Sequence, residues 1–259
     1  MTEMRAFFTA KYAQFQLAIS FLTRLPVANI AQPLPQLHQC FWAFSAVGMV
    51  IGGLVYGIFA CLIIAGVPAM MSSFAAIGSG VLLTGALHED GFADMLDGFG
   101  GGQDAHAKLA IMKDSHIGSY AVIGLIIVIG IKASSLGAVG VTLPLAISVM
   151  VIAGASRFFM ISVLTVMPPA RLDGLGHHYA AGASARTLTT VLPSLLVVLA
   201  VSFFAPAYVL LIIGTMAVIT ALTGWLAYRQ IGGQTGDICG AVQLISETSG
   251  LAMLAVLAS

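Results

Sequence analysis

Charged residues are scarce in this sequence of 259 residues, because Asp, Glu, Lys and Arg together make up only 8% of it. Soluble globular domains carry roughly 25% charged residues. Hydrophobic residues reach 59% here, and the mean hydropathy is +1.03. This composition excludes an ordinary soluble domain and indicates an integral membrane protein whose main surroundings are the lipid bilayer.

The sequence also lacks net charge and has few cysteines. Ten Lys and Arg residues balance ten Asp and Glu residues, so no basic excess would attract nucleic acid, and we expect no nucleic-acid partner. Cys40, Cys61 and Cys239 are isolated from one another. Their number and spacing predict neither a disulfide framework nor a zinc site.

The N-terminal segment lacks the small-residue cleavage site of a signal peptide. Its apolar run is interrupted by Lys11, Gln14 and Gln16. We interpret residues 1–36 as an amphipathic helix lying on the membrane surface, followed by a linker.

Apolar runs near the roughly 20 residues that cross a bilayer predict an all-α, polytopic bundle of about seven transmembrane helices. The runs lie at 42–65, 69–87, 118–139, 143–167, 189–205, 206–227 and 239–258. Residues 189–227 also fit one long hairpin broken at Pro206. No second soluble domain is visible, so we expect one membrane-embedded domain over 1–259, with its transmembrane bundle at 42–258.

The predicted loops alternate in charge. Those after the first, third and fifth spans contain no charged residue, whereas the remaining loops and the N-terminal segment hold the basic residues Arg5, Lys11, Arg24, Lys108, Lys113, Arg171, Arg186 and Arg229. The positive-inside rule therefore places the N-terminus and all the polar loops in the cytoplasm. Within the spans, Gly48, Gly52 and Gly53 predict close helix packing.

The stretch HEDGFADMLDGFGGG, at 88–102, concentrates acidic residues. Asp90, Asp94 and Asp97 follow an i, i+4, i+7 spacing, so a helix places them within a wedge of roughly 60°. Gly91 and Gly98 lie on an adjacent strip, where another backbone or a bulky substrate can come close. His88 falls on the opposite side, as a capping or substrate-contacting group.

Three carboxylates on one helical face repel one another, and a cation would offset that repulsion. Oxygen ligands without Cys or paired His favour Mg²⁺ or Mn²⁺, which complete their shells with water and phosphate oxygens. The stripe therefore predicts a metal site for a phosphate ester or diphosphate. The alternative is a solvated acidic face, which we disfavour because acids are scarce elsewhere.

Cationic residues supply candidates for phosphate binding. Arg24 and Lys113 fit either phosphate contacts or anchors at the lipid interface. Lys132 and Arg157 lie inside predicted spans, where an unpaired cation costs several kcal/mol. We expect them to contact phosphate or to form an internal salt bridge, with Glu247 as the partner.

Two further segments are candidates. Asp114 is either a metal ligand or general base, or a helix cap beside Ser115. The segment GGQTGD at 232–237 offers backbone N–H groups, Thr235 and Asp237, which suit nucleotide or phosphate contacts or a metal ligand.

Four motifs resemble the cobalamin synthase (adenosylcobinamide-GDP ribazoletransferase) family. GALHEDGFADMLDGFGGG is similar to its signature G-x-x-H-x-D-G-x-A-D-x-x-D-G, and FLTRLPV, IMKDSHIGSYA and GGQTGDICGA agree in order and spacing. The resemblance implies a magnesium-dependent transferase of cobamide biosynthesis in a bacterial or archaeal inner membrane. It would join adenosylcobinamide-GDP to α-ribazole or α-ribazole 5′-phosphate and release GMP. His116 stands where that family pattern has Arg.

The implied roles follow the matching positions. Asp90, Asp94 and Asp97 would hold Mg²⁺, and Asp90, Asp94 and Asp114 would serve catalysis. Substrate contacts would come from Arg24, His88, Lys113, Lys132, Arg157, Thr235 and Asp237. A homo-oligomer is compatible with the sequence. The alternatives are a CDP-alcohol-type phosphatidyltransferase and, in another class, a secondary transporter, which would place acids in mid-span rather than at one rim.

Overall fold

The computed structural model describes residues 2–27, 30, 32–171 and 186–258, and their side chains from residue 4 onward except for 186–190. All regular elements within these ranges are helices, which confirms the all-α prediction. The one β feature there is an isolated bridge between Pro169 and Gln234.

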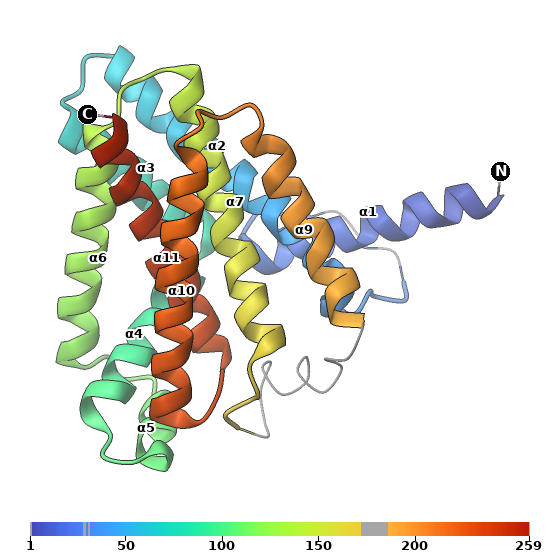
Figure 1. The fold of residues 1–259 in the computed structure, drawn as a ribbon, viewed down its shortest axis with the longest axis vertical. Coiled ribbons are helices and arrows are strands. Elements are labelled where there is room, and N and C mark those ends of the chain that lie inside the picture. Colours follow the sequence, from blue (N-terminus) through green and yellow to red (C-terminus); the bar gives the residue numbers. More distant parts are fainter. Residues whose placement is uncertain (1, 28–29, 31, 172–185, 259) are drawn as a thin grey trace.

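Long apolar helices run side by side and form the body of the molecule (Figure 1). Five of them are long and apolar enough to cross a membrane. They are α2 (Phe41–Ile64), which extends the short helix η1 (Leu37–Cys40), and then α6 (Ser119–Ala138), α7 (Leu143–Val166), α10 (Val209–Ile231) and α11 (Gly236–Ala258). The chain is therefore a polytopic membrane protein.

Two of the seven predicted spans differ from expectation. The run at 69–87 forms α3 (Ala69–Thr84), which passes the length and hydropathy test only together with α4 (Leu87–Gly101). The run at 189–205 lies in α9 (Arg186–Ser202), whose apolar part, Val191–Ser202, is shorter than a span. The described residues thus contain five candidate spans, or six if the α3–α4 pair counts as one.

A sharp bend joins α3 to α4. Gly85 and Ala86 both adopt left-handed backbone conformations, with φ of 67° and 59°, and the two helices meet at 91°. Arg24 lies over this bend: its backbone N–H donates to Leu83 O at 2.7 Å, and its side chain occupies the position that a Cβ on Gly85 would need. Glycine at position 85 therefore accommodates both the bend and Arg24.

Helix α1 (Thr2–Leu22) crosses the direction of the bundle, and its N-terminal half projects away from it (Figure 1). The other half packs on α2, where Trp42 Nε1 donates to Gln14 Oε1 at 2.8 Å. The projecting half exposes Met4, Phe7, Phe8 and Tyr12. The position of this helix on the membrane surface stays a prediction.

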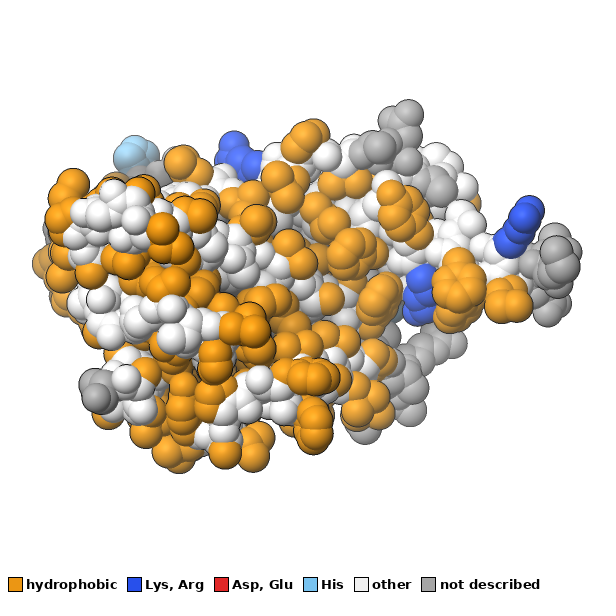
Figure 2. All heavy atoms as spheres, turned by 90° about the horizontal axis from the view of Figure 1, so that it is seen from above, with side chains coloured by type: hydrophobic (Ala, Val, Ile, Leu, Met, Phe, Trp, Pro, Cys, Tyr) orange, Lys and Arg blue, Asp and Glu red, His pale blue; other side chains and the backbone are white. Residues whose placement is uncertain are grey.

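The two ends of the bundle differ in charge. The loops 65–68, 139–142 and 203–208 contain no charged residue. The view in Figure 2, onto the upper end of the molecule in Figure 1, is largely apolar and shows no acidic side chain. The opposite end holds α4, α5 (Ala105–Ile111) and the segments 167–171 and 232–235. The acidic stretch thus lies at one end of the bundle.

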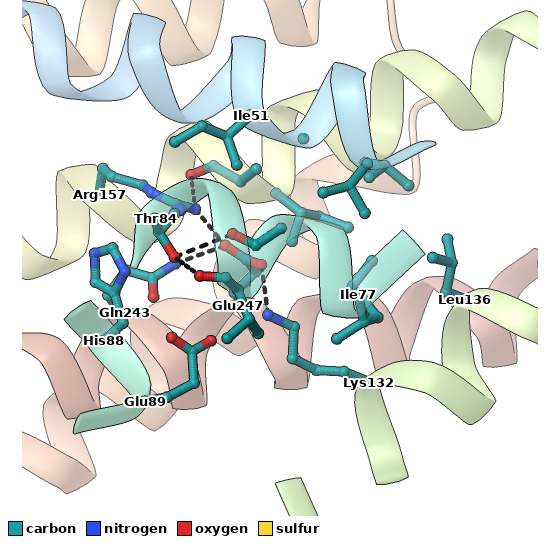
Figure 3. Close-up of a pocket in the computed structure, with 18 residues that line it drawn as sticks. Ile51, Ile77, Thr84, His88, Glu89, Lys132, Leu136, Arg157, Gln243 and Glu247 are labelled. Atoms are coloured by element: carbon teal, nitrogen blue, oxygen red, sulfur yellow. Dashed lines mark hydrogen bonds and ion pairs between the residues drawn. The ribbon is translucent and has the colours of Figure 1, made fainter. Parts of the chain in front are cut away.

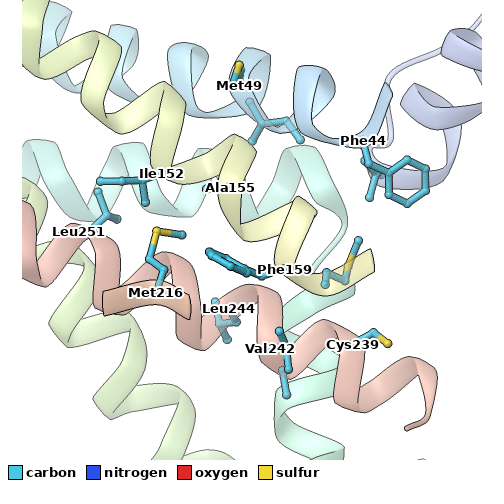
Figure 4. Close-up of a cluster of buried hydrophobic side chains, with 14 of the residues drawn as sticks. Phe44, Met49, Ile152, Ala155, Phe159, Met216, Cys239, Val242, Leu244 and Leu251 are labelled. Carbon is cyan, nitrogen blue, oxygen red and sulfur yellow. The ribbon is translucent and has the colours of Figure 1, made fainter. Parts of the chain in front are cut away.

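Small residues allow α2 and α7 to approach closely. A Cβ added to Gly48 would lie 2.6 Å from Ala153 O, and one on Gly52 would lie 2.6 Å from Ala153 Cβ. This confirms the packing role predicted for these glycines. Beside this contact, Phe44, Ile152 and other side chains shown in Figure 4 form the apolar core. All three cysteines are free thiols, as expected.

Candidate active site

Helix α4 is continuous through the acidic stretch and presents two different faces. Asp90 is exposed and Asp94 is partly buried, whereas His88 and Glu89 are almost fully buried. His88 and Glu89 line a cavity inside the bundle (Figure 3). His88 is thus buried, in contrast to the exposed Asp90, and Glu89, to which the sequence assigned no role, shares its inward position.

Gly91 lets the start of α11 approach the acidic helix. A Cβ on Gly91 would lie 2.8 Å from Asp237 O, and one on Gly240 would lie 3.5 Å from the Cα of Gly91. This confirms the close approach predicted at Gly91 and identifies α11 as the neighbouring helix. A fourth carboxylate, that of Asp237 at the start of α11, therefore lies near Asp90 and Asp94.

The four aspartates interact electrostatically around Asp94. The charges of Asp90, Asp237 and Asp97 all act on the Asp94 carboxyl group, and the Arg171 guanidinium partly offsets them. Like charges in partly buried surroundings are unfavourable without a counter-ion. The region is thus suited to attract a cation.

Asp237 is held by a nearby hydroxyl and by a cation. Thr235 Oγ1 donates to Asp237 Oδ2 at 3.1 Å, and Arg171 Nη2 lies 3.3 Å from the same oxygen. Thr235 Oγ1 also accepts from Ile238 N at 3.3 Å, so it caps the start of α11. Arg171 Nη1 is buried and has no hydrogen-bond partner among the described residues.

Arg171 was not among the predicted site residues. Its only sequence signal was its place at the end of the fourth span, on the polar side. The segment that carries it pairs with the 232–237 loop: Gln234 N donates to Pro168 O at 2.8 Å, and Ala170 N donates to Gln234 O at 2.9 Å. Two segments distant in sequence thus place Arg171 against Asp237.

Asp97 has a structural role that the sequence did not reveal. Its Oδ2 accepts from Gly118 N at 2.5 Å and its Oδ1 from Ala121 N at 3.0 Å. The carboxylate therefore satisfies free N–H groups at the first turn of α6. In the part of the chain that the structure describes, no three His, Cys, Asp or Glu side chains are arranged to hold a metal ion.

The loop between α5 and α6 carries Lys113, Asp114 and His116, all exposed to solvent. Asp114 Oδ1 accepts from His116 N at 3.1 Å and lies 2.6 Å from His116 Nδ1. The His116 hydrogen bond lowers the pKa of Asp114, and the same bond raises the pKa of His116. This pairing favours a charged couple at the surface.

The predicted cations inside the bundle form ion pairs with one carboxylate. Lys132 Nζ lies 2.8 Å from Glu247 Oε1, and Arg157 Nη1 contacts Glu247 Oε2. Gln243 Nε2 donates to that same Oε2 at 2.6 Å. The expected internal salt bridge to Glu247 is thus confirmed for both Lys132 and Arg157 (Figure 3).

The ion pairs line the same cavity as His88 and Glu89. Its volume of about 40 Å³ exceeds what one water molecule needs. Three of its lining residues carry a buried polar atom without a hydrogen-bond partner among the described residues, namely His88 Nε2, Glu89 Oε2 and Arg157 Nε. Both apolar and polar side chains line this small cavity.

A second cavity, of about 160 Å³, shares the lining residue His88 with the first. Asp90 and Asp237 line it together with a mostly apolar wall. The wall comprises Phe21, Leu37, Phe41, Phe44, Leu87, Met160, Ile161, Leu164 and Cys239. This cavity is therefore mostly apolar, but two members of the acidic group, Asp90 and Asp237, line part of it.

The comparisons with known proteins agree with these motifs. The model of the cobalamin-5-phosphate synthase family matches residues 14–255. Three relatives bear the name adenosylcobinamide-GDP ribazoletransferase. The protein of a Sinorhizobium species is 34% identical, covering 92% of this chain and 94% of its own. That of Sinorhizobium medicae is 35% identical, covering 99% of both chains. That of Shewanella frigidimarina is 36% identical, covering 90% of both chains.

No solved structure matches the chain. The family match covers far more than half of the sequence and includes α4, the α5–α6 loop and the start of α11. The chain belongs to the cobalamin-5-phosphate synthase family.

Proposed function

We propose that this protein is an adenosylcobinamide-GDP ribazoletransferase, a membrane enzyme of cobalamin biosynthesis. It joins adenosylcobinamide-GDP to α-ribazole or α-ribazole 5′-phosphate, and it forms adenosylcobalamin or its phosphate together with GMP. The observation that carries the proposal is the family match over residues 14–255, together with relatives of that name over nearly the whole chain.

The local geometry supports a phosphoryl-group transfer at α4. Asp90, Asp94 and Asp237 come from two helices that meet at Gly91, and Arg171 lies against Asp237. Such transfers need mainly positioning and neutralisation of charge. The acidic group and the adjacent cation supply groups of both signs in one region.

The donor set fits a magnesium ion by its chemistry. Asp90, Asp94 and Asp97 offer hard oxygen ligands, and magnesium is commonly held by one or two carboxylates plus substrate phosphates. A preformed cluster of three side chains is therefore not required. We assign these three residues to the ion, with Asp97 using lone pairs that its backbone hydrogen bonds leave available. Bound magnesium would neutralise charge on the diphosphate.

In the proposed reaction, a secondary ribose hydroxyl of the acceptor attacks the corrinoid-side phosphorus of the diphosphate, because in α-ribazole 5′-phosphate the 5′ oxygen already carries the phosphate that the product retains. The bond from that phosphorus to the GMP oxygen breaks, and GMP leaves with the electron pair. An acidic side chain takes the hydroxyl proton. Asp90, Asp94 and Asp114 are our candidates. The hydrogen bonds from His116 lower the pKa of Asp114, so its carboxylate is a weaker base than that of an ordinary aspartate.

Cations at the same end of the bundle are proposed to contact the substrates' phosphates. Arg24 lies exposed at the α3–α4 bend and Lys113 is exposed in the α5–α6 loop. Thr235 and Asp237 remain proposed substrate contacts beside Arg171. Lys132 and Arg157 form ion pairs with Glu247. We therefore assign them mainly a structural role inside the bundle, and a substrate contact only second.

The proposed orientation puts this end of the bundle in the cytoplasm of a bacterial inner membrane. The distribution of basic residues supports it, because eight of the ten Lys and Arg residues of the sequence lie in the N-terminal segment or in the loops on that side. The bulky, water-soluble donor and acceptor would then reach the acidic group without crossing the membrane. The apolar outer faces of the helices are compatible with a homo-oligomer.

The two alternatives have less support. A phosphatidyltransferase would share the metal chemistry, and a transporter would use the buried Lys132–Glu247 pair as an ion relay. The family match favours neither. The deciding experiment measures GMP released from adenosylcobinamide-GDP by the purified protein on adding α-ribazole, with and without Mg²⁺. Release that needs both supports the proposal. No GMP release from this donor, together with CMP release from a CDP-activated lipid, would refute it.

A further inference from the structure

We propose that the larger cavity, lined by Asp90, Asp237, His88 and the apolar wall, binds the aromatic base of the acceptor nucleoside. We further propose that His88 Nε2 donates a hydrogen bond to a ring nitrogen of that base. The inference rests on the proposed function, because it concerns the acceptor of that same reaction.

The size of the cavity indicates which part of the two substrates can bind in it. Its volume is about 160 Å³, and an engineered apolar cavity of roughly 150 Å³ in another protein takes up benzene. The cavity therefore suits an aromatic base of one or two rings. A corrinoid macrocycle is several times too large for it, so the donor's main body must lie elsewhere.

The wall of the cavity suits an apolar aromatic ring. Phe41 and Phe44 meet edge to face with ring centroids 5.3 Å apart, and Phe21 stacks on Phe44 at 5.7 Å. Phe41 and Phe44 are each only 2% exposed. Aromatic side chains of this kind favour offset-stacked or edge-to-face partners. A benzimidazole-type base would find such partners here, whereas the polar guanine of the donor would bury its hydrogen-bonding groups against hydrocarbon.

His88 provides the polar contact that an apolar wall lacks. It is 2% exposed, lines this cavity, and its Nε2 has no hydrogen-bond partner in the described part of the chain. A buried ring N–H without a partner is costly. The ring nitrogen of a benzimidazole nucleoside that does not carry the sugar has a lone pair and no hydrogen, so it accepts the hydrogen bond that His88 can donate.

The acidic side of the cavity suits the sugar of the same nucleoside. Asp90 and Asp237 line the cavity together with the apolar wall, so a base bound there places its ribose near carboxylates that accept hydroxyl hydrogens. The attacking hydroxyl would thereby lie beside the group assigned to the diphosphate. Anionic phosphate on its own would be repelled by the same two carboxylates.

A cycle that combines a substrate analogue with a variant tests this contact. The analogue is α-ribazole in which the accepting ring nitrogen is replaced by C–H. For the wild-type enzyme, KM for the analogue should exceed KM for α-ribazole by about tenfold or more, because the His88 N–H is left unsatisfied. In His88→Ala that ratio should fall to about one. A wild-type ratio near one, or an unchanged ratio in His88→Ala, would overturn the inference.

A pair of phenylalanine variants on α2 tests the wall and does not depend on the folding of the His88 variant. Phe44→Leu should raise KM for α-ribazole several-fold and leave KM for adenosylcobinamide-GDP unchanged. Phe59, also on α2 and only 1% exposed, lines neither cavity, so Phe59→Leu is the matched control and should change neither KM. Equal effects of both variants on KM for α-ribazole would overturn the inference.

The outcomes separate the two proposals. If no acceptor releases GMP from the donor, the proposed function fails and this inference falls with it. If α-ribazole releases GMP normally while the analogue ratio stays near one, the proposed function stands and the cavity assignment alone is refuted.

Discussion

Lys132 Nζ and Glu247 Oε1 lie 2.8 Å apart inside the bundle, and the other oxygen of Glu247 contacts Arg157. One carboxylate from α11 thus balances two cations, from α6 and from α7. The side chains of Lys132 and Arg157 are 8% and 3% exposed. In such surroundings the loss of a partner charge is not compensated by solvent.

Glu247→Gln should therefore destabilise the protein strongly. The substitution keeps the shape of the side chain but leaves two buried cations without a counter-charge, and breaking a buried pair costs about 3–5 kcal/mol. Lys132→Met should cost less, because Glu247 keeps Arg157 as its partner. Thermal unfolding of the detergent-solubilised variants measures the difference. Equal losses in the two variants would show that Glu247 does not serve both cations.

Asp90→Ala tests the acidic stripe. Because Asp90 is exposed, its removal should leave a folded, membrane-inserted protein. Loss of one preorganised charged group should lower magnesium-dependent GMP release at least about a hundredfold. Asp104, which caps α5 by accepting from Ala107 N at 2.8 Å, supplies the control, since Asp104→Ala removes a nearby acid outside the stripe and should keep activity. Undiminished turnover in Asp90→Ala would remove Asp90 from the site.

Asp97 has two proposed roles, which two substitutions can separate. Asp97→Ala removes both acceptors for the first turn of α6 and should cost about 1–2 kcal/mol, as for other lost helix caps. Asp97→Asn keeps one acceptor oxygen and should cost less. Both variants lose the negative charge, so both should need more Mg²⁺ for half-maximal activity. An unchanged Mg²⁺ requirement beside reduced thermal stability would leave Asp97 as a cap alone.

The helical plan was largely predictable because it depends on local composition. Apolar runs at 42–65, 118–139 and 143–167 correspond to α2, α6 and α7 to within a residue at each end. The bend between α3 and α4 was not predicted, since the apolar run continues through Gly85 and Ala86. The bend depends on left-handed backbone conformations at Gly85 and Ala86 and on Arg24, which packs against Gly85 from another segment. Hydrophobic periodicity along the chain does not predict such a contact.

The candidate site was predictable only in part. The spacing of Asp90, Asp94 and Asp97 identified one helical face, and the glycine at position 91 indicated a close neighbour. Which residues meet that face depends on contacts between distant segments. The pairing of Arg171 with Asp237 is of this kind. The use of Asp97 as a cap for α6, 21 residues away, is another.

Gly91→Ala should disturb the junction of α4 with α11. The added Cβ would lie 2.8 Å from Asp237 O, a backbone atom that cannot move without its helix. We expect a loss of about 1–3 kcal/mol, as in other overpacked sites, with reduced GMP release because Asp237 moves away from the stripe. Gly57→Ala in α2 is the control, since no atom lies within 4 Å of its added Cβ. If both alanine variants behave alike, the close approach at Gly91 does not matter for activity.

The pairing of His116 with Asp114 predicts a pH dependence of substrate capture. The pKa of His116 is raised by the hydrogen bond to Asp114, so His116 keeps its positive charge above the ordinary histidine value of about 6.5 and loses it as the pH rises through the raised value. Because the family pattern that the sequence resembles is expected to have Arg at this position, we expect the charge to assist binding of the diphosphate donor.

Accordingly, kcat/KM for the donor should fall by up to about fivefold as the pH rises through the His116 transition, a size typical of an exposed ion pair. His116→Arg should abolish the fall, because its charge does not titrate in this range. His106→Arg adds the same charge on α5, away from the Asp114 pair, and should leave the wild-type pH profile in place. A decline that persists unchanged in His116→Arg would assign the titration to another group and leave His116 without a part in donor binding.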